Sequence, residues 1–278
     1  MSTYELKDRV VVITGGAGGL GRALATALRA RGAKLALLDM DEQASVEAAR
    51  LIGAADVARG WAVDVRDYAR LETVLAEVDA HFGRIDVVIA NAGVAMTPGP
   101  LSDLDPELWD FGVDINLNGV FRTLRAAIPH VARTGGYLLA TSSMAAFVHL
   151  PLAGYYPASK AAVWGLCNTL RGELAHQGIA VGSLHPTFFK TPMLDRVRAG
   201  GPSASRDYKL MPIEVVVAQT IRGIETRAKH IFAPGNMGFF ARMPFFAQSR
   251  TERRMLSGSY VRDSIAAARA RRAERPNA

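Results

Sequence analysis

The chain has 278 residues, 49% hydrophobic and 21% charged, which allows a large buried core and excludes disorder of the bulk. Its single cysteine excludes an internal disulfide, and its six histidines lack metal-ligand spacing, so we expect no metal site. The formal net charge is +7, but between Ala241 and Ala278 nine arginines stand against three acidic residues. The basic character therefore belongs to the chain's end, and nucleic acid is not an expected partner.

The beginning of the chain is polar and leads directly into the apolar run Val10–Ile13. It lacks the apolar core of a signal peptide. No uncharged run approaches the roughly 20 apolar residues that a membrane-spanning helix needs. We therefore expect a cytoplasmic protein.

Strand-like apolar runs alternate with helical segments along the chain. The expected strands are Val10–Thr14, Lys34–Asp39, Gly60–Asp64, Ile85–Asn91, Tyr137–Ser142 and Ala180–His185, with His230–Ala233 as a further candidate. The expected helices are about Gly19–Arg31, Gln43–Leu51, Tyr68–Phe82, the Asp105–Val131 region and Tyr156–His176.

Continuous apolar strands are typical of a sheet with helices on both faces. The alternation predicts an α/β fold with a doubly wound parallel sheet of Rossmann type. We expect a single catalytic domain over residues 1–237, followed by an aromatic and Arg-rich C-terminal extension over residues 238–278.

A glycine-rich turn lies between the first expected strand and the first expected helix. Such turns let the backbone approach a dinucleotide pyrophosphate, to which the helix offers free N–H groups. Two registers fit, one using Gly16, Gly18 and Gly21 and the other using Gly15, Gly19 and Gly21. The run holds so many glycines that spacing alone does not choose between them.

The second expected strand ends at Asp39, 18 residues beyond Gly21. A carboxylate at this position accepts hydrogen bonds from ribose hydroxyls and repels a 2′-phosphate. No Arg or Lys follows directly, which favours NAD over NADP. Arg22, just after the turn, is the residue that could favour a phosphate instead.

Several motifs in order resemble the short-chain dehydrogenase/reductase family over about Lys7 to Met193. The turn resembles the family's cofactor loop, which favours the register of Gly15, Gly19 and Gly21. The resemblance implies further cofactor contacts at Leu20, Asp64, Val65, Asn91, Ala92, Gly93, Pro186, Phe189 and Thr191. Thr187 stands where the family usually has glycine, and the segment from Arg242 onward has no counterpart in the minimal pattern.

Four residues fall on the family's catalytic positions: Asn116, Ser143, Tyr156 and Lys160. Tyr156 is the expected proton donor and acceptor, and a lysine one helical turn away favours its ionised form. Ser143 can hydrogen-bond the substrate oxygen. The resemblance further implies that Lys160 and Tyr156 contact the cofactor and that Asn116 holds a proton-relaying water.

These residues predict an NAD(H)-dependent oxidoreductase that interconverts an apolar secondary alcohol and its ketone. The expected flanking residues are mostly apolar: Val94, Met96, Met144, His149, Leu150, Phe188 and Met193. The alternatives are an NADPH-dependent carbonyl reductase and a nicotinamide-sensing regulatory protein without turnover.

Two further features concern access and assembly. We expect a substrate lid at about residues 187–212, where a Gly-Gly-Pro-Ser sequence occurs. The phenylalanines after Gly238 could cover the substrate, contact another subunit or touch a membrane peripherally. The family resemblance implies a homodimer or homotetramer packed through the Asp105–Val131 and Tyr156–His176 helices.

Overall fold

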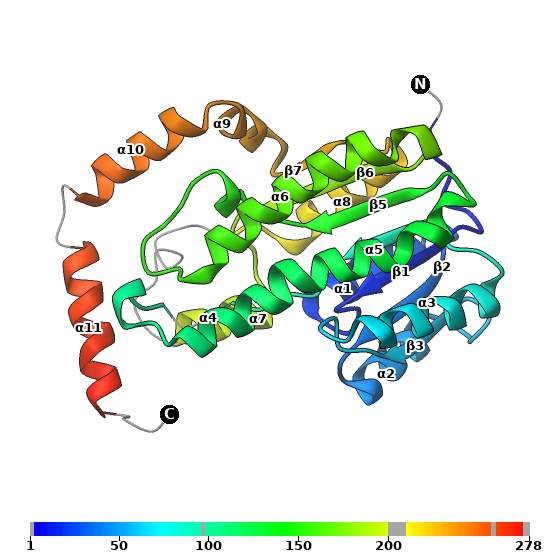
Figure 1. The fold of residues 1–278 in the computed structure, drawn as a ribbon, viewed down its shortest axis with the longest axis horizontal. Helices are drawn as coiled ribbons and strands as arrows, with labels where there is room; N and C mark the ends of the chain where they lie inside the picture. Colours follow the sequence, from blue (N-terminus) through cyan, green and yellow to red (C-terminus); the bar gives the residue numbers. More distant parts are fainter. Residues whose placement is uncertain (1–2, 96–97, 200–209, 257–259, 275–278) are drawn as a thin grey trace.

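A computed structural model describes residues 3–95, 98–199, 210–256 and 260–274 (Figure 1). Within these residues, a seven-stranded parallel sheet has the order β3-β2-β1-β4-β5-β6-β7. The strands are β1 (Val10–Thr14), β2 (Lys34–Asp39), β3 (Ala58–Ala62), β4 (Val87–Ala90), β5 (Tyr137–Thr141), β6 (Ala180–Pro186) and β7 (His230–Ala233). The order reverses between β1 and β4, where ligands of open α/β sheets bind. The predicted doubly wound fold is confirmed.

Helices cover both faces of this sheet (Figure 1). The helices up to the last strand are α1 (Gly19–Arg29), α2 (Glu42–Ile52), α3 (Tyr68–Phe82), α4 (Pro106–Val113), α5 (Gly119–Ala132), α6 (Tyr155–Leu174), α7 (Pro192–Ala199) and α8 (Ile213–Glu225). Side chains of α3, α5 and α6 pack on one face, and those of α1, α2 and α8 pack on the other.

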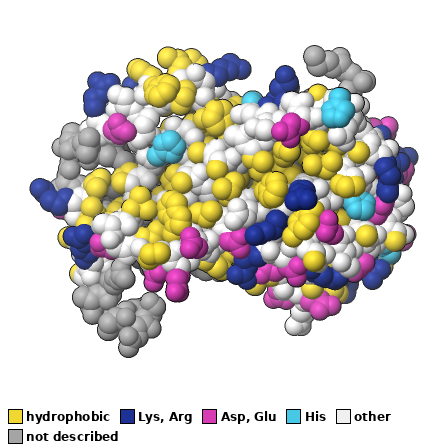
Figure 2. Space-filling model, viewed as in Figure 1, with side chains coloured by type: hydrophobic (Ala, Val, Ile, Leu, Met, Phe, Trp, Pro, Cys, Tyr) yellow, Lys and Arg dark blue, Asp and Glu magenta, His cyan; other side chains and the backbone are white. Residues whose placement is uncertain are grey.

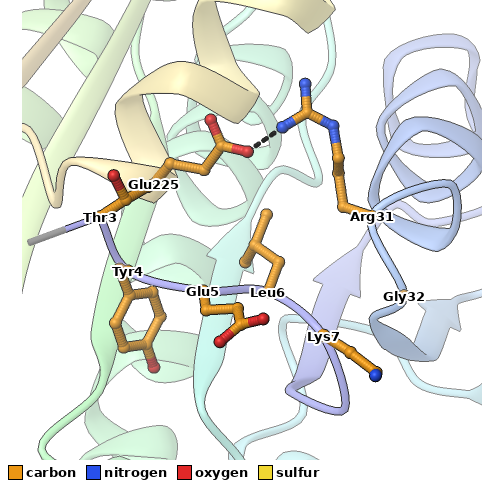
Figure 3. Close-up of a pocket in the computed structure, with 8 residues that line it drawn as sticks. All are labelled: Thr3, Tyr4, Glu5, Leu6, Lys7, Arg31, Gly32 and Glu225. Carbon is orange, nitrogen blue, oxygen red and sulfur yellow. Dashed lines mark hydrogen bonds and ion pairs between the residues drawn. The ribbon is translucent and has the colours of Figure 1, made fainter.

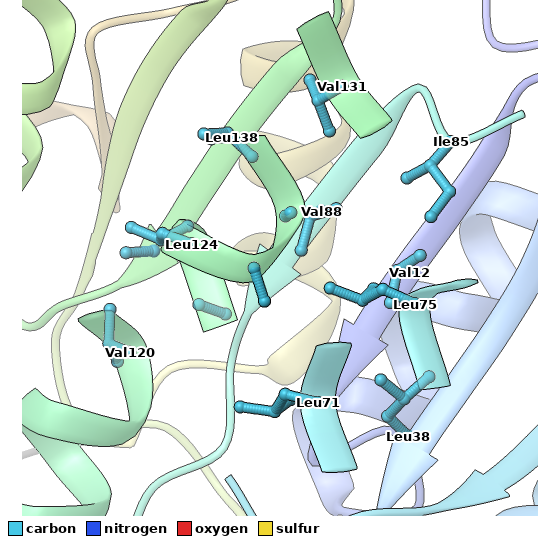
Figure 4. Close-up of a cluster of buried hydrophobic side chains, with 14 of the residues drawn as sticks. Val12, Leu38, Leu71, Leu75, Ile85, Val88, Val120, Leu124, Val131 and Leu138 are labelled. Atoms are coloured by element: carbon cyan, nitrogen blue, oxygen red, sulfur yellow. The ribbon is translucent and has the colours of Figure 1, made fainter. Parts of the chain in front are cut away.

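The core on the first face shows why the strands read as continuous apolar runs. Val12, Val88 and Leu138 of neighbouring strands point toward Leu75 of α3 and Leu124 of α5 (Figure 4). All five side chains are fully buried. The opposite face is covered by helices as well, so the alternate residues of each strand are also buried. This packing on both faces fixes the positions of the strands' carboxyl ends.

The third strand begins two residues earlier than the sequence predicts. It contains an exposed Arg59 and a glycine, so its pattern lacks a continuous apolar run. Gly60 is required there because an added Cβ would lie 2.4 Å from the backbone carbon of Ser45 in α2. The close approach of a helix, which sequence pattern does not reveal, explains the strand's position.

The amino ends of the strands form the edge opposite the glycine turn. There the backbone N–H of Tyr4 donates to the carbonyl of Glu225 (2.7 Å), and Arg31 pairs with the Glu225 carboxylate (Figure 3). A shallow pocket lies between this segment and the ends of α1 and α8. Its position indicates a tether for the N-terminal segment and not a part of the catalytic edge.

In the described part of the chain after the last strand, the α-helices are α9 (Gly238–Arg242), α10 (Pro244–Leu256) and α11 (Tyr260–Glu274). They extend around the end of the molecule where α4 and α6 begin (Figure 1). Gln248 Oε1 accepts from the backbone N–H of His149 (2.8 Å), and Arg269 pairs with Asp103 (2.7 Å). Among the described residues, no helix is long and apolar enough to cross a membrane. The domain boundary at residue 237 stays a prediction.

Candidate active site

The glycine turn between β1 and α1 is tightly closed. Gly15 has a φ of +64°, which favours glycine, and an added Cβ there would lie 3.0 Å from Ala92 Cα. At Gly21 an added Cβ would lie 2.2 Å from the carbonyl oxygen of Gly15. The helix begins at Gly19 without a side-chain cap and without an acidic residue in its first turn. An anion such as a pyrophosphate suits this N-terminus.

Asp39 lies beside the turn at the end of β2. Its Oδ2 accepts from the backbone N–H of Ala17 (3.1 Å), which holds the carboxylate against the glycine loop. Arg22 comes one helical turn after Gly18, whose carbonyl accepts its backbone N–H (2.9 Å). No ion pair between Arg22 and Asp39 is found within the described residues. The carboxylate is thus held in the position that the sequence predicts for a ribose contact.

Asn91 connects three strand ends behind the turn. Its Nδ2 donates to the carbonyls of Thr14 (3.1 Å) and Gly15 (3.3 Å), while its Oδ1 accepts from Thr141 Oγ1 (3.3 Å). Thr14 Oγ1 in turn accepts the backbone N–H groups of Asn91 (3.0 Å) and Ala92 (3.2 Å). The Asn-Ala-Gly turn at residues 91–93 therefore holds the start of the glycine loop in place through these hydrogen bonds.

Tyr156 lies in the first turn of α6, as the proposed tyrosine–lysine spacing requires. The Ser143 side chain acts on its phenol and lowers its pKa, and Lys160 Nζ lies 5.6 Å from the centre of its ring. The Lys160 ammonium is buried and donates to the carbonyl of Thr141 (2.9 Å). The structure thus brings three of the four predicted catalytic side chains together at the ends of β5 and α6.

Burial dominates the protonation equilibria of this group. Burial raises the pKa of Tyr156, and the hydrogen bond from Ser143 opposes that rise without cancelling it. Burial also lowers the pKa of Lys160 to about 8. The expectation that Lys160 favours the phenolate stays a prediction.

Asn116 is fully buried in a π-helical turn, Asp114–Asn118, between α4 and α5. Its Oδ1 accepts from the N–H of Val94 (2.8 Å) and its Nδ2 donates to the Val94 carbonyl (2.9 Å). An added Cβ at Gly93 would lie 3.1 Å from Asn116 Oδ1 and 3.5 Å from Lys160 Nζ. Asn116 and Lys160 therefore converge on Gly93. Single-turn π-helices frequently mark functional positions.

Two residues next to the catalytic positions have structural contacts. Tyr155 is buried, and its ring packs on α4 so closely that an added Cβ at Gly112 would lie 2.3 Å from it. Ser142 is buried too, and its hydroxyl donates to the backbone carbonyl of Lys160 (2.8 Å). These contacts fix α6 against α4 and β5, so that Tyr156 and Ser143 face each other.

The remaining predicted cofactor residues lie at the same edge of the sheet. Asp64 forms an ion pair with Arg66 (2.6 Å) that lowers the pKa of its carboxyl, and Val65 packs against Gly119 of α5. Pro186 ends β6, and its carbonyl accepts from Ser143 Oγ at 3.5 Å. These positions place all three beside the strand ends, but their contacts with a cofactor stay predictions.

The segment after β6 approaches the glycine turn. Phe189 pairs with Met211, and the Thr191 methyl would lie 3.6 Å from a Cβ added at Gly19. The described part of the predicted lid contains α7, while its residues 200–209, including the Gly-Gly-Pro-Ser sequence, lie outside the described residues. Met96 of the expected substrate side also lies outside them.

The sequence does not predict the residues that hold the site's side chains and backbone in place. Thr14 and Thr141 hold Asn91 and Lys160, and β-branched residues in a buried strand give no sign of such a role. His185 is fully buried, and its Nδ1 lies 3.4 Å from the carbonyl oxygen of Ser143. Burial lowers the pKa of His185 to about 3, so the ring is neutral and sets the backbone of Ser143 without adding charge.

The geometry fits a dinucleotide and a small organic substrate. The uncapped helix and the tight turn suit a pyrophosphate, and Asp39 suits a ribose. Tyr156, Ser143 and Lys160 then lie further along the same sheet edge, where a nicotinamide would meet its substrate. Among the described residues, no group of His, Cys, Asp and Glu could hold a metal ion.

Comparison with known proteins agrees with this description. The family model of short chain dehydrogenases matches residues 9–201. An uncharacterized NAD-dependent oxidoreductase of Mycobacterium tuberculosis is 38% identical over 69% of this chain and 75% of its own. The (-)-trans-carveol dehydrogenase of Rhodococcus erythropolis is 37% identical (68% and 74%), and the D-threitol dehydrogenase of Mycolicibacterium smegmatis is 35% identical (75% and 80%).

A solved structure extends the similarity to the fold. A short chain dehydrogenase/reductase from Burkholderia phymatum in complex with NAD superimposes with a TM-score of 0.76 and 27% identity. The match covers 86% of this chain and 93% of that one. The chain belongs to the short-chain dehydrogenase/reductase family, and the predicted enzyme class, an oxidoreductase acting on CH–OH groups, is confirmed.

Proposed function

We propose that this enzyme interconverts a secondary alcohol and its ketone with NAD(H), using Tyr156 as the general acid and base. One observation carries the proposal: Lys160 Nζ lies 5.6 Å from the ring of Tyr156, and the Ser143 side chain acts on the Tyr156 phenol and lowers its pKa. Tyrosine and lysine one turn apart occur on many helices, but here Lys160 is buried and Tyr156 half-buried at the functional edge of the sheet. A tyrosine–lysine pair that served only as surface packing would lie on a solvated helix face instead.

Proton handling follows from the positions of these groups. In alcohol oxidation, the ionised Tyr156 oxygen takes the hydroxyl proton, and in ketone reduction its phenol returns one. Ser143 donates a hydrogen bond to the substrate oxygen as negative charge develops there. A bound nicotinamide supplies or accepts the hydride. Lys160 and Asn116 converge on Gly93. We assign these two side chains to the path by which protons reach and leave the Tyr156 phenol.

The choice of NAD over NADP rests on Asp39. Its carboxylate is fixed by the N–H of Ala17, so it cannot easily turn away from a 2′-phosphate. Repulsion between these two anions favours a free ribose. The names of the M. tuberculosis relative and of the B. phymatum structure, which specify NAD, support this choice.

We further propose an apolar alcohol or ketone as the substrate. Val94, Leu150 and Phe188 are the apolar residues expected on the substrate side, whereas Met144 belongs to the core with Phe147. The relatives' names specify carveol, which is apolar, and threitol, which is polar. The apolar residues expected on the substrate side support the apolar class.

A substrate panel tests this proposal. The enzyme is incubated with NAD and a set of cyclic secondary alcohols, polyols and hydroxy acids, and the reduced nicotinamide is followed by its absorbance. We expect kcat/KM to be highest for the apolar cyclic alcohols. Turnover confined to polyols or hydroxy acids would overturn the substrate class, and cofactor binding without any turnover would favour a sensing protein.

We also propose a homodimer or homotetramer assembled through α4, α5 and α6. Large apolar side chains on α4 and α5 are exposed, namely Leu108, Phe111 and Phe121 (40%, 42% and 44%). Hydrophobic side chains spread across the middle of the face seen in Figure 2, over these helices. A contact between subunits would remove this surface from water.

A further inference from the structure

The C-terminal extension carries an exposed apolar patch that the proposed chemistry does not use. It consists of Phe239, Phe240, Met243, Phe245 and Phe246, with exposed fractions of 61%, 38%, 45%, 91% and 51%. Figure 2 shows yellow side chains gathered at the top edge, over α9 and the start of α10, with dark blue side chains on either side. Monomeric proteins rarely expose such a contiguous aromatic surface without a function.

The orientation of this patch is fixed by the body of the protein. Ala247 is buried, and Gln248 accepts the backbone N–H of His149 (2.8 Å). These two residues turn one side of α10 inward. Phe245 and Phe246 consequently face solvent, which also excludes them as a cover over the catalytic side chains.

Cations share the outward face of α10. Arg250 and Arg253 follow Phe246 by four and seven residues, a spacing that places all three on one side of a helix, and both arginines are exposed. The exposed Arg242 lies between the phenylalanines of α9 and α10. Glu252, whose carboxylate accepts from Gln248 Nε2 (2.9 Å), is the only acidic residue from residue 226 to residue 262. The patch is therefore apolar and cationic together.

A groove continues the patch toward the body of the protein. It has a volume of about 730 Å³, with Phe147, Trp164 and Phe232 among its lining residues. Lys229 and Arg242 also line it, so its apolar walls carry positive charge. This combination matches an amphiphile with an apolar chain and an anionic headgroup.

We propose that the patch docks the enzyme on an anionic lipid surface. The phenylalanines would enter the boundary between headgroups and acyl chains, and Arg242, Arg250 and Arg253 would contact the anionic headgroups. A second copy of the chain fits less well. A two-fold interface centred on this patch would bring Arg242, Arg250 and Arg253 against their own copies, with only Glu252 in the segment to pair them.

Vesicle co-sedimentation of the full-length enzyme tests the proposal. Vesicles of phosphatidylcholine alone are compared with vesicles containing phosphatidylglycerol, each at low salt and at about 1 M salt, where the Debye length is about 3 Å. We expect binding to the anionic vesicles at low salt, and at least about tenfold weaker binding to neutral vesicles or at high salt.

Matched variants assign the binding to the patch. The double variant Phe245→Ser/Phe246→Ser should weaken anionic-vesicle binding at least about tenfold, and Arg250→Gln/Arg253→Gln should act in the same direction. Leu51→Ser, which alters an apolar residue of α2 that is 59% exposed, is the control and should bind as the wild type does. Circular dichroism and turnover of a water-soluble substrate should be unchanged in all three, which separates this proposal from the proposed reaction.

Three outcomes would overturn the proposal. The first is no binding of the wild-type enzyme to anionic vesicles at low salt. The second is equal binding of the phenylalanine double variant and the wild type. The third is a lighter particle for the double variant in sedimentation velocity, because that result would assign the patch to contacts between copies of the chain.

Discussion

At the scale of single residues, two opposing effects act on Tyr156. Burial raises the pKa of its phenol, while the hydrogen bond from Ser143 lowers it. The sequence predicts the Tyr156–Lys160 pair from a spacing of four, but not that Lys160 Nζ donates to Thr141. The spacing of four shows that Tyr156 and Lys160 share a helix face. The burial of these two side chains depends on residues far apart in the chain, which the spacing does not show.

The pH dependence follows from the direction of that shift. Ketone reduction requires the protonated phenol, which is present below its pKa and lost as the pH rises through it. Because the pKa is raised, kcat/KM for reduction should stay constant through neutral pH, while oxidation should increase with pH. Loss of the Lys160 charge above pH of about 8 should raise the tyrosine pKa further. Initial rates in both directions measure this, and oxidation that declines from neutral to alkaline pH would contradict it.

Asp39 is predicted to set cofactor preference. In Asp39→Ala the hydrogen bond to Ala17 and the anionic charge are both lost, so KM for NAD should rise about tenfold, equivalent to about 1.4 kcal/mol, and KM for NADP should fall. Asp41→Ala is the matched control, because Asp41 caps α2 through Ala44 instead (2.9 Å). Steady-state kinetics with both cofactors measure the ratio, and an unchanged preference in Asp39→Ala would refute this role.

At the scale of elements, the sequence predicts the strands and the helices up to α6 within a few residues, but it does not predict the helices from α7 onward. Strands that are buried on both faces appear in the sequence as continuous apolar runs, and the glycine turn shows where α1 begins. The π-helical turn that holds Asn116 and the early start of β3 are not predicted. Both depend on packing between distant segments, such as Gly93 against Asn116 and Gly60 against Ser45. The local sequence pattern does not reveal these close contacts between distant segments.

The junction of α4 and α6 offers a test of packing. Gly112→Ala should destabilise the protein by about 1–3 kcal/mol, because the new methyl would lie 2.3 Å from the ring of Tyr155. Gly165→Ala in α6 is the control, since nothing lies within 4 Å of its added Cβ. That change should be neutral or stabilising by up to about 1 kcal/mol. Urea unfolding measures both, and equal stabilities would contradict the packing described.

At the scale of the whole molecule, two exposed apolar surfaces have different expected partners. The surface on α4 and α5 continues across helices of the catalytic body, which suits another subunit. The patch on α9 and α10 lies beyond residue 201, where the family model ends, and is surrounded by cations. The sequence predicts an aromatic and basic extension, but its attachment through Gln248 and Arg269 becomes visible only in the structure.

Subunit assembly distinguishes the two surfaces. Phe121→Asp should convert the oligomer to a lighter species, because it places a charge within the proposed interface of α4 and α5. Phe245→Asp is the matched control in the extension and should leave the particle mass unchanged. Sedimentation velocity without lipid provides the measurement. A wild-type monomer, or dissociation by Phe245→Asp alone, would contradict the assignment.

In the proposed mechanism, the hydroxyl of Tyr156 transfers the substrate proton. Its most direct test compares Tyr156→Phe with Tyr155→Phe, since each change removes one hydroxyl from adjacent rings of α6. Tyr156→Phe should lower kcat at least about 10²-fold, with NAD affinity by fluorescence titration nearly unchanged, while Tyr155→Phe should retain most activity. Turnover at the wild-type rate in Tyr156→Phe would contradict the mechanism.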